Sequence, residues 1–350
     1  MDFEIPETEA EAERRAADFA RTRAAELGRM ADLDRAVLRD LLASAERAGA
    51  GGGSMAARLA WARASLPLFL SVEATRHMRD LVHRVGSEAL SRLVREDRVG
   101  AVALAGPAGA GPAALRRAGG GLRLSARKSF VTNGPLADRI AVFAEAEGRE
   151  VVCLVAPGEE GVEVGRGMDL MGLGGLAVAS LTLEDAPVSP DRVLGPLPDR
   201  SASARYLRDA NLTLATGAAG LLRSALSAAR RHALARERDG RPLFSRQEVA
   251  FRLAEVLSLA EAAELLCHRA AWMADASDPE ADTVVRCAKV FCTESAERAA
   301  SACLQVMGGE GYRRDNPVER AYRDAKGLAL SGTTLEVARM EIADALLARA

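Results

Sequence analysis

The chain from Ser201 to its end has the pattern of long helices with hardly an interruption. Apolar residues recur there three and four positions apart, as at Val249, Leu253, Val256 and Leu257, and this spacing gives a helix one apolar face. Helices of such length are normal in a four-helix bundle, where facing apolar stripes cover one another. The last part of the chain is therefore predicted to be a four-helix bundle.

Two zones of different texture precede the bundle. Residues 1–97 are again helical in pattern, whereas residues 98–198 carry short β-branched or alternating runs separated by glycine- and proline-rich turns. Such runs predict an antiparallel β-barrel or sandwich. The expected fold class is a multidomain α+β protein with an N-terminal helical domain (1–97), a middle β domain (98–198) and a C-terminal bundle (199–350).

Two local signals mark helix ends. Ser245 followed by Glu248 fits a capping box, in which each side chain satisfies a free backbone N–H of the first turn, so a helix is expected to begin at Ser245. Gly308 and Gly309 are expected to end a long helix, because glycine readily adopts the left-handed conformation that follows a last turn.

Charge and apolarity exclude several classes of partner. The 350 residues include 47 Lys+Arg and 49 Asp+Glu, a net charge of −2, so the basic excess of nucleic-acid-binding proteins is absent. The most apolar run, Leu66–Val72, is far shorter than the roughly 20 residues that span a membrane. We therefore expect neither a nucleic-acid nor a membrane partner.

The cysteines are too scattered for a disulfide framework or a zinc site. Neither a CxxC motif nor a metal-like Cys/His spacing occurs among the five, which are Cys153, Cys267, Cys287, Cys292 and Cys303. We expect reduced thiols in the core, no bound metal, and a cytoplasmic protein. The acidic N-terminal sequence, without an apolar signal core, favours the same location.

Four segments of the chain form a pattern with a known counterpart. They are GSEALSRLVREDRVGAVALAGP (Gly86–Pro107), RKSFVTNGPLADRIAVFA (Arg127–Ala144), LARERDGRPLFSRQEVAFRLAEV (Leu234–Val256) and QVMGGEGYRRDNPVERAYRDAKGLALSGTTLEVAR (Gln305–Arg339). In this order and spacing they resemble the acyl-CoA dehydrogenase family of flavoproteins. The resemblance implies the same helical, β and bundle domains, an FAD cofactor, and an acyl thioester of coenzyme A or of an acyl carrier protein as substrate.

The resemblance implies a site for the flavin ring at the end of the second segment. Phe130 takes the place of the aromatic residue beside the isoalloxazine, and Thr132 that of a hydroxyl near flavin N5. A neutral donor there steadies the negative charge that the ring gains on reduction. The alternative is that Phe130 simply fills the interior of a barrel.

The other half of FAD is implied to bind elsewhere along the chain. Arg236 matches the arginine that reaches the pyrophosphate across a subunit interface, where a guanidinium suits phosphate geometry. Gln305, Gly308 and Gly309 match the turn around the adenosine half, and the cofactor-binding set also includes Thr334. The alternatives are a surface arginine and an ordinary helix end. Binding across subunits implies a homodimer or homotetramer.

The usual catalytic base of the family is missing. Its carboxylate removes the α-proton of the thioester, yet the corresponding position holds Gly332 or, in the other alignment, Ser331. A second position used by some relatives holds Ala210. Asp209 is the candidate that remains, but one residue along a helix is a rotation of about 100°, so we expect it to point elsewhere unless the helix slips by one residue.

Three functions therefore remain open. The first is an FAD-dependent oxidoreductase that acts on an acyl thioester with a displaced base. The second is a flavin-dependent monooxygenase or N-hydroxylase of the same fold, as in branches of the family in secondary metabolism, for which a thioester base is dispensable. The third is an inactive subunit that pairs with an active relative. Retention of Phe130, Thr132 and Arg236 favours the first two.

Overall fold

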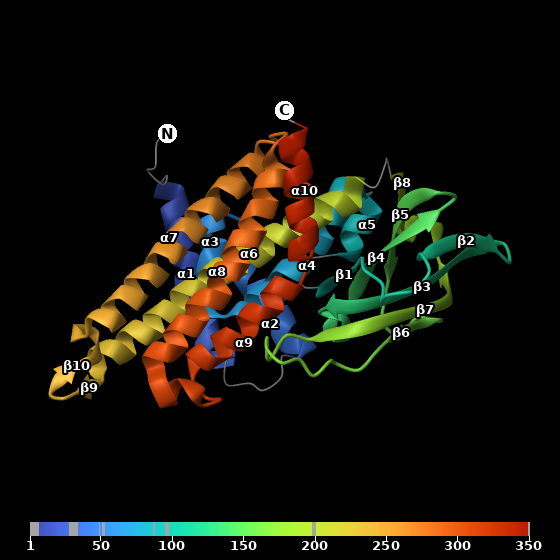
Figure 1. Ribbon diagram of the computed structural model, residues 1–350. Coiled ribbons are helices and arrows are strands. Elements are labelled where there is room, and N and C mark those ends of the chain that lie inside the picture. The colour runs from blue at the N-terminus through green and yellow to red at the C-terminus, as the bar shows by residue number, and fades with distance from the viewer. Residues whose placement is uncertain are drawn as a thin grey trace.

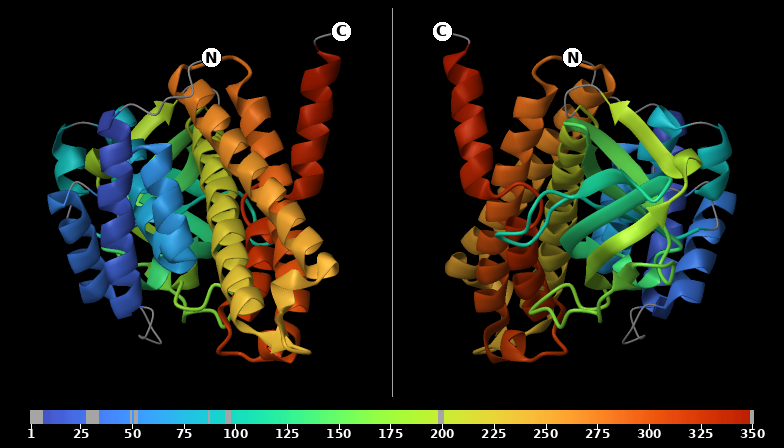
Figure 2. Two further views of the ribbon diagram at one scale, coloured as in Figure 1. Left: turned by 90° about the vertical axis from the view of Figure 1, so that its left-hand side faces the viewer. Right: turned by 90° about the vertical axis from the view of Figure 1, so that its right-hand side faces the viewer.

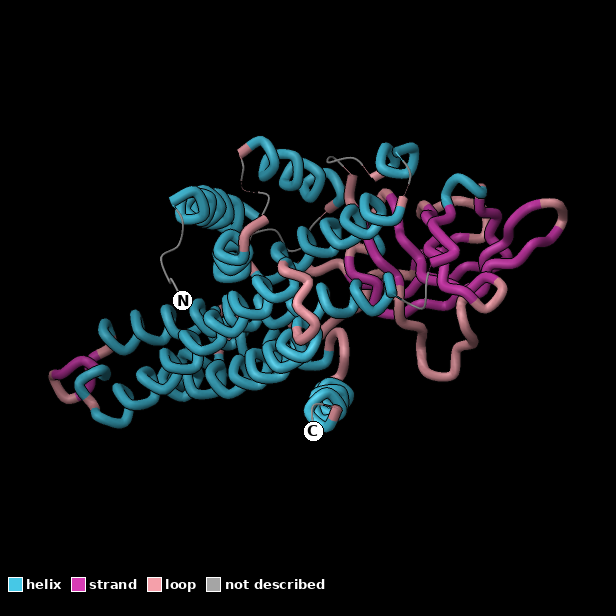
Figure 3. The backbone as a smooth tube through the Cα atoms, turned by 90° about the horizontal axis from the view of Figure 1, so that it is seen from above, coloured by secondary structure: helices cyan, strands magenta, loops and turns pink. Residues whose placement is uncertain are grey.

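The computed structural model describes residues 7–27, 34–48, 50, 53–86, 88–94, 98–197 and 201–348. Strands gather at one side of the molecule and the long helices at the other, as the views along two axes agree (Figures 1 and 3). Helices precede the sheet, the sheet follows, and longer helices complete the chain. This order is the α–β–α arrangement expected from the sequence.

Two of the N-terminal helices begin at side-chain caps. Asp34 accepts a hydrogen bond from the amide of Val37 (2.8 Å) and Ser54 one from the amide of Ala57 (3.2 Å), so each satisfies a free N–H of a first turn. The helices before the sheet are α1 (Glu7–Leu27), α2 (Arg35–Arg47), α3 (Met55–Ala64), α4 (Leu66–Val85) and α5 (Glu88–Leu93).

The middle of the chain forms a sheet in the order β6-β7-β3-β2-β4-β5-β8, with β1 paired to β4. Its inward residues alternate along the strands and form a separate apolar core. The strands are β1 (Gly100–Ala103), β2 (Ala114–Ala118), β3 (Gly121–Thr132), β4 (Arg139–Ala146), β5 (Arg149–Val155), β6 (Val162–Val164), β7 (Val178–Val188) and β8 (Val193–Leu197).

The sheet is mostly antiparallel, as predicted, but β1 departs from the prediction. It runs parallel to β4, with Gly100 opposite Arg139 and Ala103 opposite Val142. All four of its residues are buried, as is typical of a strand covered on both faces. The carboxylate of Asp138 fixes its start by accepting a hydrogen bond from the amide of Val99 (2.9 Å).

The C-terminal helices confirm the predicted bundle. They are α6 (Ser201–Ala235), α7 (Gln247–Asp275), α8 (Ala281–Met307), α9 (Pro317–Leu330) and α10 (Leu335–Leu347), and the hairpin β9 (Glu237–Arg238) and β10 (Arg241–Pro242) joins α6 to α7. Helix α10 leans away from the others (Figure 2). None of the described helices is long and apolar enough to cross a bilayer.

The two predicted helix ends had different outcomes. Gly308 follows α8 with φ 60°, as expected. The capping box was wrong: α7 begins at Gln247, and the hydroxyl of Ser245 donates to the carbonyl of Pro242 (2.7 Å) instead. A 3-10 turn just before the helix occupies this serine, so its hydroxyl does not cap the helix.

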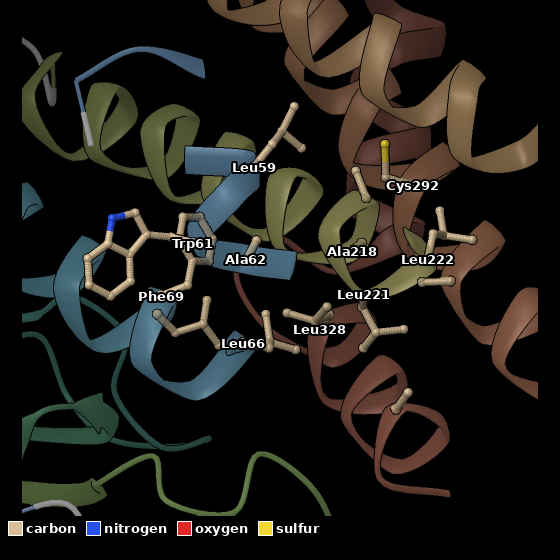
Figure 4. Packing of buried hydrophobic residues seen from close by; sticks show 14 of the residues in the cluster. Leu59, Trp61, Ala62, Leu66, Phe69, Ala218, Leu221, Leu222, Cys292 and Leu328 are labelled. Carbon is tan, nitrogen blue, oxygen red and sulfur yellow. The ribbon is translucent and has the colours of Figure 1, made fainter. Parts of the chain in front are cut away.

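Helix α6 is the central element that positions the site. It contacts α3, α4, α7, α8 and α9, and Figure 4 shows its apolar face meeting Ala62, Leu66 and Leu328. The approach is close enough to require glycine: a Cβ on Gly220 would lie 2.5 Å from that of Ala62. Residues of α6 are therefore held in a fixed position relative to the N-terminal helices.

Candidate active site

The end of β3 presents an aromatic ring at the surface. Phe130 has φ 53° and is 69% exposed, and the pairing of β3 with β7 shifts register between Lys128 and Val131. A positive φ is costly for a bulky residue and persists where the surroundings impose it. The strand thus turns this ring outward, and Phe130 does not fill the barrel interior.

The next residues anchor this strand end to helix α4. Thr132 is half-buried and pairs with Val178 at the start of β7. Asn133 is fully buried, and its side-chain amide donates to the carbonyl of Ser71 (2.8 Å) and to that of Gly100 (3.2 Å). These bonds fix the positions of Phe130 and Thr132 relative to the helices.

The loop before β7 joins the same region to helix α9. The amide of Leu173 donates to the carboxylate of Asp324 (2.5 Å), and a Cβ on Gly172 would lie 2.6 Å from the carbonyl oxygen of Arg323. Burial raises the pKa of Asp324 above its ordinary value. The strand ends that carry Phe130 therefore lie against the bundle at α9.

The turn between α9 and α10 is clamped to α6. Asn211 donates to the hydroxyl of Thr333 (2.9 Å) and accepts from its amide (3.1 Å). Gly332 has φ 69°, and a Cβ there would lie 2.7 Å from Leu214 Cδ1 and 2.8 Å from Asn211 Oδ1. The turn therefore accepts glycine and resists any larger residue at position 332.

The same clamp brings the sequence positions of the expected base into one region. Asn211 directly follows Ala210 on α6 and holds the turn that contains Ser331 and Gly332. The hydroxyl of Ser331 donates to the carbonyl of Gly327 (2.7 Å), which commits it to the end of α9. None of these three positions, Ala210, Ser331 and Gly332, offers a carboxylate.

A cavity of about 300 Å³ lies between α4, β8 and the first turns of α6. Asp209 lines it with 33% of its side chain exposed, and its Oδ1 receives hydrogen bonds from the Arg208 guanidinium (3.1 and 3.2 Å). The cavity is lined by His77, Asp80, Leu81, Arg84, Leu197, Ser201, Ala202, Arg205, Tyr206 and Asp209. Asp209 thus borders an internal space, but an arginine engages its carboxylate.

His77 lines this cavity from α4 and was not among the residues predicted from the sequence. Its ring meets Tyr206 edge-on at 5.8 Å between centroids, and its Nε2 lies 3.0 Å from the hydroxyl of Thr213. The available signal was the pair Glu73 and His77, four residues apart just after the apolar run Leu66–Val72. That spacing puts both on one face of a helix.

Of the remaining predicted cofactor residues, Thr334 directly follows the clamped turn, whereas Arg236, Gln305, Gly308 and Gly309 lie at the other end of the bundle. Arg236 precedes the β9–β10 hairpin, which projects from the end away from the sheet (Figure 1). Gln305, Gly308 and Gly309 are exposed where α8 ends. Thr334 caps α10 by accepting from the amide of Val337 (3.3 Å), so its hydroxyl already has a local role.

Comparison with known proteins identifies relatives of this chain. The family model described as acyl-CoA dehydrogenase, C-terminal domain, matches residues 201–347. The chain is 33% identical over 269 residues to 3-(aryl)acrylate reductase of Clostridium sporogenes, covering 74% of this chain and 71% of the relative. The chain belongs to the acyl-CoA dehydrogenase family. It is also 31% identical over 275 residues to benzylmalonyl-CoA dehydrogenase of Aromatoleum aromaticum, covering 75% and 71% of the two chains.

Solved structures of the acyl-CoA dehydrogenase family share the fold over the whole chain. Butyryl-CoA dehydrogenase from Megasphaera elsdenii matches with a TM-score of 0.89 at 25% identity, covering 99% of this chain and 100% of that one. A chain of the ChsE4–ChsE5 complex from Mycobacterium tuberculosis matches with 0.85 at 27%, covering 99% of both. The expected fold and the expected class, an FAD-dependent flavoprotein oxidoreductase, are confirmed.

The residues present fit the FAD of an acyl-CoA dehydrogenase. The ring of Phe130 is uncovered, as a face for an aromatic ligand requires. Arg236 is exposed, and within the described ranges no carboxylate lies within ion-pair distance of it. A Cβ on Gly308 or Gly309 would meet nothing within 4 Å, so the backbone there is open to close approach.

Proposed function

We propose that this protein binds FAD and transfers hydrogen between an acyl thioester and its α,β-unsaturated counterpart. The observation that carries the proposal is the outward ring of Phe130 at φ 53°, close in sequence to Thr132, on a strand whose partner β7 follows a loop bonded to α9. Backbone strain of this kind concentrates at functional sites. Benzylmalonyl-CoA dehydrogenase, a relative, is named for a CoA thioester.

We assign the cofactor contacts to two groups of residues. Phe130 would lie beside the flavin ring and Thr132 would donate to it, while Arg236 of a second subunit would bind the pyrophosphate. Gln305, Gly308, Gly309 and Thr334 complete the proposed contacts. When bound, FAD supplies the acceptor for a hydride from the β-carbon of the substrate. A planar guanidinium with its donors free is well suited to the pyrophosphate.

A homodimer or homotetramer follows from the same assignment. In one chain the hairpin after Arg236 lies at the far end of the bundle from the strand that carries Phe130 (Figure 1). Large apolar side chains are uncovered on the outer helices, including Met340 (67%) and Leu347 (72%) on α10 and Trp272 (68%) on α7. Apolar surface of this kind marks an interface with another chain.

The carrier and the location are assigned from chemistry. The cavity between α4 and α6 has Arg84 and Arg205 in its wall, which suits the phosphates of coenzyme A or of a carrier-protein arm equally. The nearest cysteine contact, Cys267 to Cys292, has its sulfurs 3.9 Å apart, and all five thiols are free. Free thiols support the proposal of a cytoplasmic protein.

An inactive subunit is the second candidate. The non-ionisable residues at positions 210, 331 and 332 favour it, and the related ChsE4–ChsE5 complex is named for two different chains. In this case FAD binding or a partner would be retained without turnover. The monooxygenase alternative likewise dispenses with a base but predicts oxygen consumption.

The deciding experiment is anaerobic mixing of the FAD-loaded protein with acyl thioesters of coenzyme A and of acyl carrier protein. Bleaching of the oxidised flavin absorbance by a saturated thioester, or reoxidation of the reduced flavin by an unsaturated one, is expected. Failure of every thioester in both directions would reject the proposal and leave the inactive-subunit or monooxygenase function. Oxygen uptake without thioester turnover would select the latter.

A further inference from the structure

A cluster of charged side chains is buried between α3, α4 and α6. We call it the Glu73 cluster; its members are Arg58, Glu73, Arg76, His77 and Thr213. Glu73 Oε2 accepts hydrogen bonds from Arg58 Nη2 (2.6 Å), Arg76 Nη2 (2.8 Å) and the hydroxyl of Thr213 (3.0 Å). Glu73, Arg58, His77 and Thr213 are each less than one-tenth exposed. Burying this many charges is costly, so the cluster needs a reason beyond stability.

The hydrogen bonds favour the tautomer of His77 that carries its proton on Nε2. Thr213 has one hydroxyl hydrogen, which it donates to Glu73, and its oxygen already accepts from Arg58 (2.7 Å). The contact of 3.0 Å between His77 Nε2 and this oxygen is then a donation from Nε2–H. Neutral imidazole carries one proton, so Nδ1 keeps a free lone pair.

The free nitrogen belongs to a residue that lines the cavity. Among the described residues Nδ1 of His77 has no hydrogen-bond partner, and its neighbours on the cavity wall include Asp80, Tyr206 and Asp209. Burial raises the pKa of Tyr206 to about 12, so its phenol stays neutral. The carboxylate of Asp209 is engaged by Arg208. Of these four cavity residues, His77 is the one with a ring nitrogen held in place by a hydrogen bond from its other nitrogen to Thr213.

The cluster lies on the same stretch of α6 as the residues that contact the region where the base is missing. Thr213, which bonds His77, directly precedes Leu214, which lies against Gly332. Asn211, two residues earlier, clamps the turn of Gly332 and Thr333. Helix α6 therefore connects His77 to the turn that would hold the glutamate of a typical relative.

We propose that His77 is the base that removes the α-proton of the thioester, with Thr213 and Glu73 as positioning residues. The inference rests on the proposed function. The α C–H bond breaks, its proton passes to Nδ1 of His77, and its electron pair becomes the new Cα–Cβ double bond as hydride leaves Cβ for the oxidised flavin. The imidazolium that results faces the negative charge of Glu73, 3.7 Å from Nε2.

The charges around His77 favour this use. Burial by itself raises the pKa of Glu73, but Arg58, Arg76 and the interaction with His77 outweigh it and hold the pKa well below its usual range. Glu73 is therefore ionised whenever His77 accepts a proton. Besides Glu73, the charged or titratable groups around His77 in the cluster and the cavity wall are Arg58 from α3, Arg76, Asp80 and Arg84 from α4, and Arg205, Tyr206 and Asp209 from α6.

The test replaces His77 by glutamine in the FAD-loaded protein. The side-chain amide of the introduced glutamine can still donate to Thr213, so the fold and FAD affinity are expected to remain, whereas no base remains. His77→Gln should slow flavin reduction by the saturated thioester about 10²–10⁴-fold. His83→Gln is the matched control, because His83 is an exposed histidine on the same helix, bonded to Ser91.

Two further measurements separate catalysis from structure. Thr213→Ser keeps the hydroxyl and should stay near the wild-type rate. Thr213→Val loses the tautomer control and should be slower even when assayed well below its melting temperature, which should fall because its buried hydrogen bonds to Arg58 and Glu73 are lost. NMR of the four histidine rings in the unloaded protein should show Nε2–H for His77, and its signals should shift when an acyl thioester binds. A Nδ1–H tautomer would overturn the inference.

The outcomes distinguish the inference from the proposed function. Wild-type bleaching that survives in His77→Gln would overturn the role of His77 and leave the oxidoreductase function intact. Loss of bleaching in Asp209→Asn, with His77→Gln unaffected, would transfer the role to Asp209. Failure of every thioester to react with the wild type, together with unshifted His77 signals, would reject both.

Discussion

Beside the sheet, the candidate site is built from residues that bond to one another within a single chain. Asn133 and Asn211 are buried, and each bonds two elements that are distant in sequence. At the opposite end of the bundle, Arg236, Gln305 and Gly309 are exposed, and the contacts within the described residues do not join them to Phe130. The sheet end is held in place by contacts within one chain, whereas the residues that we propose to bind FAD at the far end are exposed.

This difference explains why one chain is insufficient for the proposed FAD site. A ring face at Phe130 and a pyrophosphate contact at Arg236 cannot serve one cofactor when they lie at opposite ends (Figure 1). Two chains placed head to tail bring the far end of one beside the sheet end of the other. The uncovered apolar side chains of α7 and α10 supply the contact surface that such an assembly needs.

The largest effect is expected on the free energy of unfolding when the carboxylate of Glu73 is removed. Glu73→Ala leaves Arg58 and Arg76 buried without their carboxylate, and breaking a buried pair in this way costs about 3–5 kcal/mol. Chemical denaturation should show this loss in free energy of unfolding. Glu248→Ala, at an exposed pair with Arg252, is the control and should change it by less than about 1 kcal/mol.

The same carboxylate predicts how the free energy of unfolding changes with pH. The folded pKa of Glu73 is depressed, so its contribution is present above the unfolded value of about 4.3 and is lost as the pH falls further. The free energy of unfolding of the wild type should therefore decline below about pH 4.3, and Glu73→Gln should lack that part of the decline. A variant with the same acid profile as the wild type would contradict the ionised cluster.

The second-largest effect is expected on FAD affinity, when Arg236 at the hairpin end of the bundle is replaced. Arg236→Ala should weaken FAD about 10- to 150-fold, the equivalent of about 1.5–3 kcal/mol for one charge-assisted contact. Arg238→Ala, a neighbouring exposed arginine, should leave the affinity unchanged. Calorimetric titration of the unloaded protein measures both, and equal affinities for the wild type and Arg236→Ala would make Arg236 a surface residue only.

Subunit mixing then tests whether Arg236 acts across an interface. A protein lacking Arg236 and a protein lacking Phe130 each have every site damaged, but a mixed dimer would regain one site with both residues. Partial recovery of tight FAD binding on mixing is expected, and light scattering should report at least a dimer. A monomer with tight FAD would show that both halves of the site lie in one chain.

A third, smaller effect is expected on stability, and it should differ between Gly332 beside α6 and Gly309 at the end of α8. Gly332→Ala meets Leu214 and Asn211 and must keep φ 69°, so it should cost about 2 kcal/mol of stability. Gly309→Ala meets nothing within 4 Å and should change stability by less than about 0.5 kcal/mol. Gly332→Glu meets the same two atoms, so restoring the family's carboxylate there would also displace the Asn211 clamp.

Patterns local in sequence predicted the helices and strands, because hydrophobic period and turn residues act over a few positions. Pairings between distant segments were not accessible in that way. Nothing in Gly100–Ala103 reveals a parallel partner at Arg139, and His77 lies 136 residues from Thr213, the residue that orients it. The resemblance located Phe130 and Thr132, whereas the strain at Phe130 and the engagement of Asp209 by Arg208 emerged only in three dimensions.

The smallest effect separates the two roles available to Thr334. As the cap of α10 its hydroxyl accepts from the amide of Val337 (3.3 Å), and removing such a cap costs about 1 kcal/mol. If capping is its role, Thr334→Ala should speed hydrogen exchange in the first turn of α10 in the unloaded protein, with Thr334→Ser near the wild type. If Thr334 also binds FAD, Thr334→Ala should weaken FAD by more than the lost helix stability explains. FAD titrations of the two variants therefore show whether Thr334 belongs to the proposed cofactor site or only caps α10.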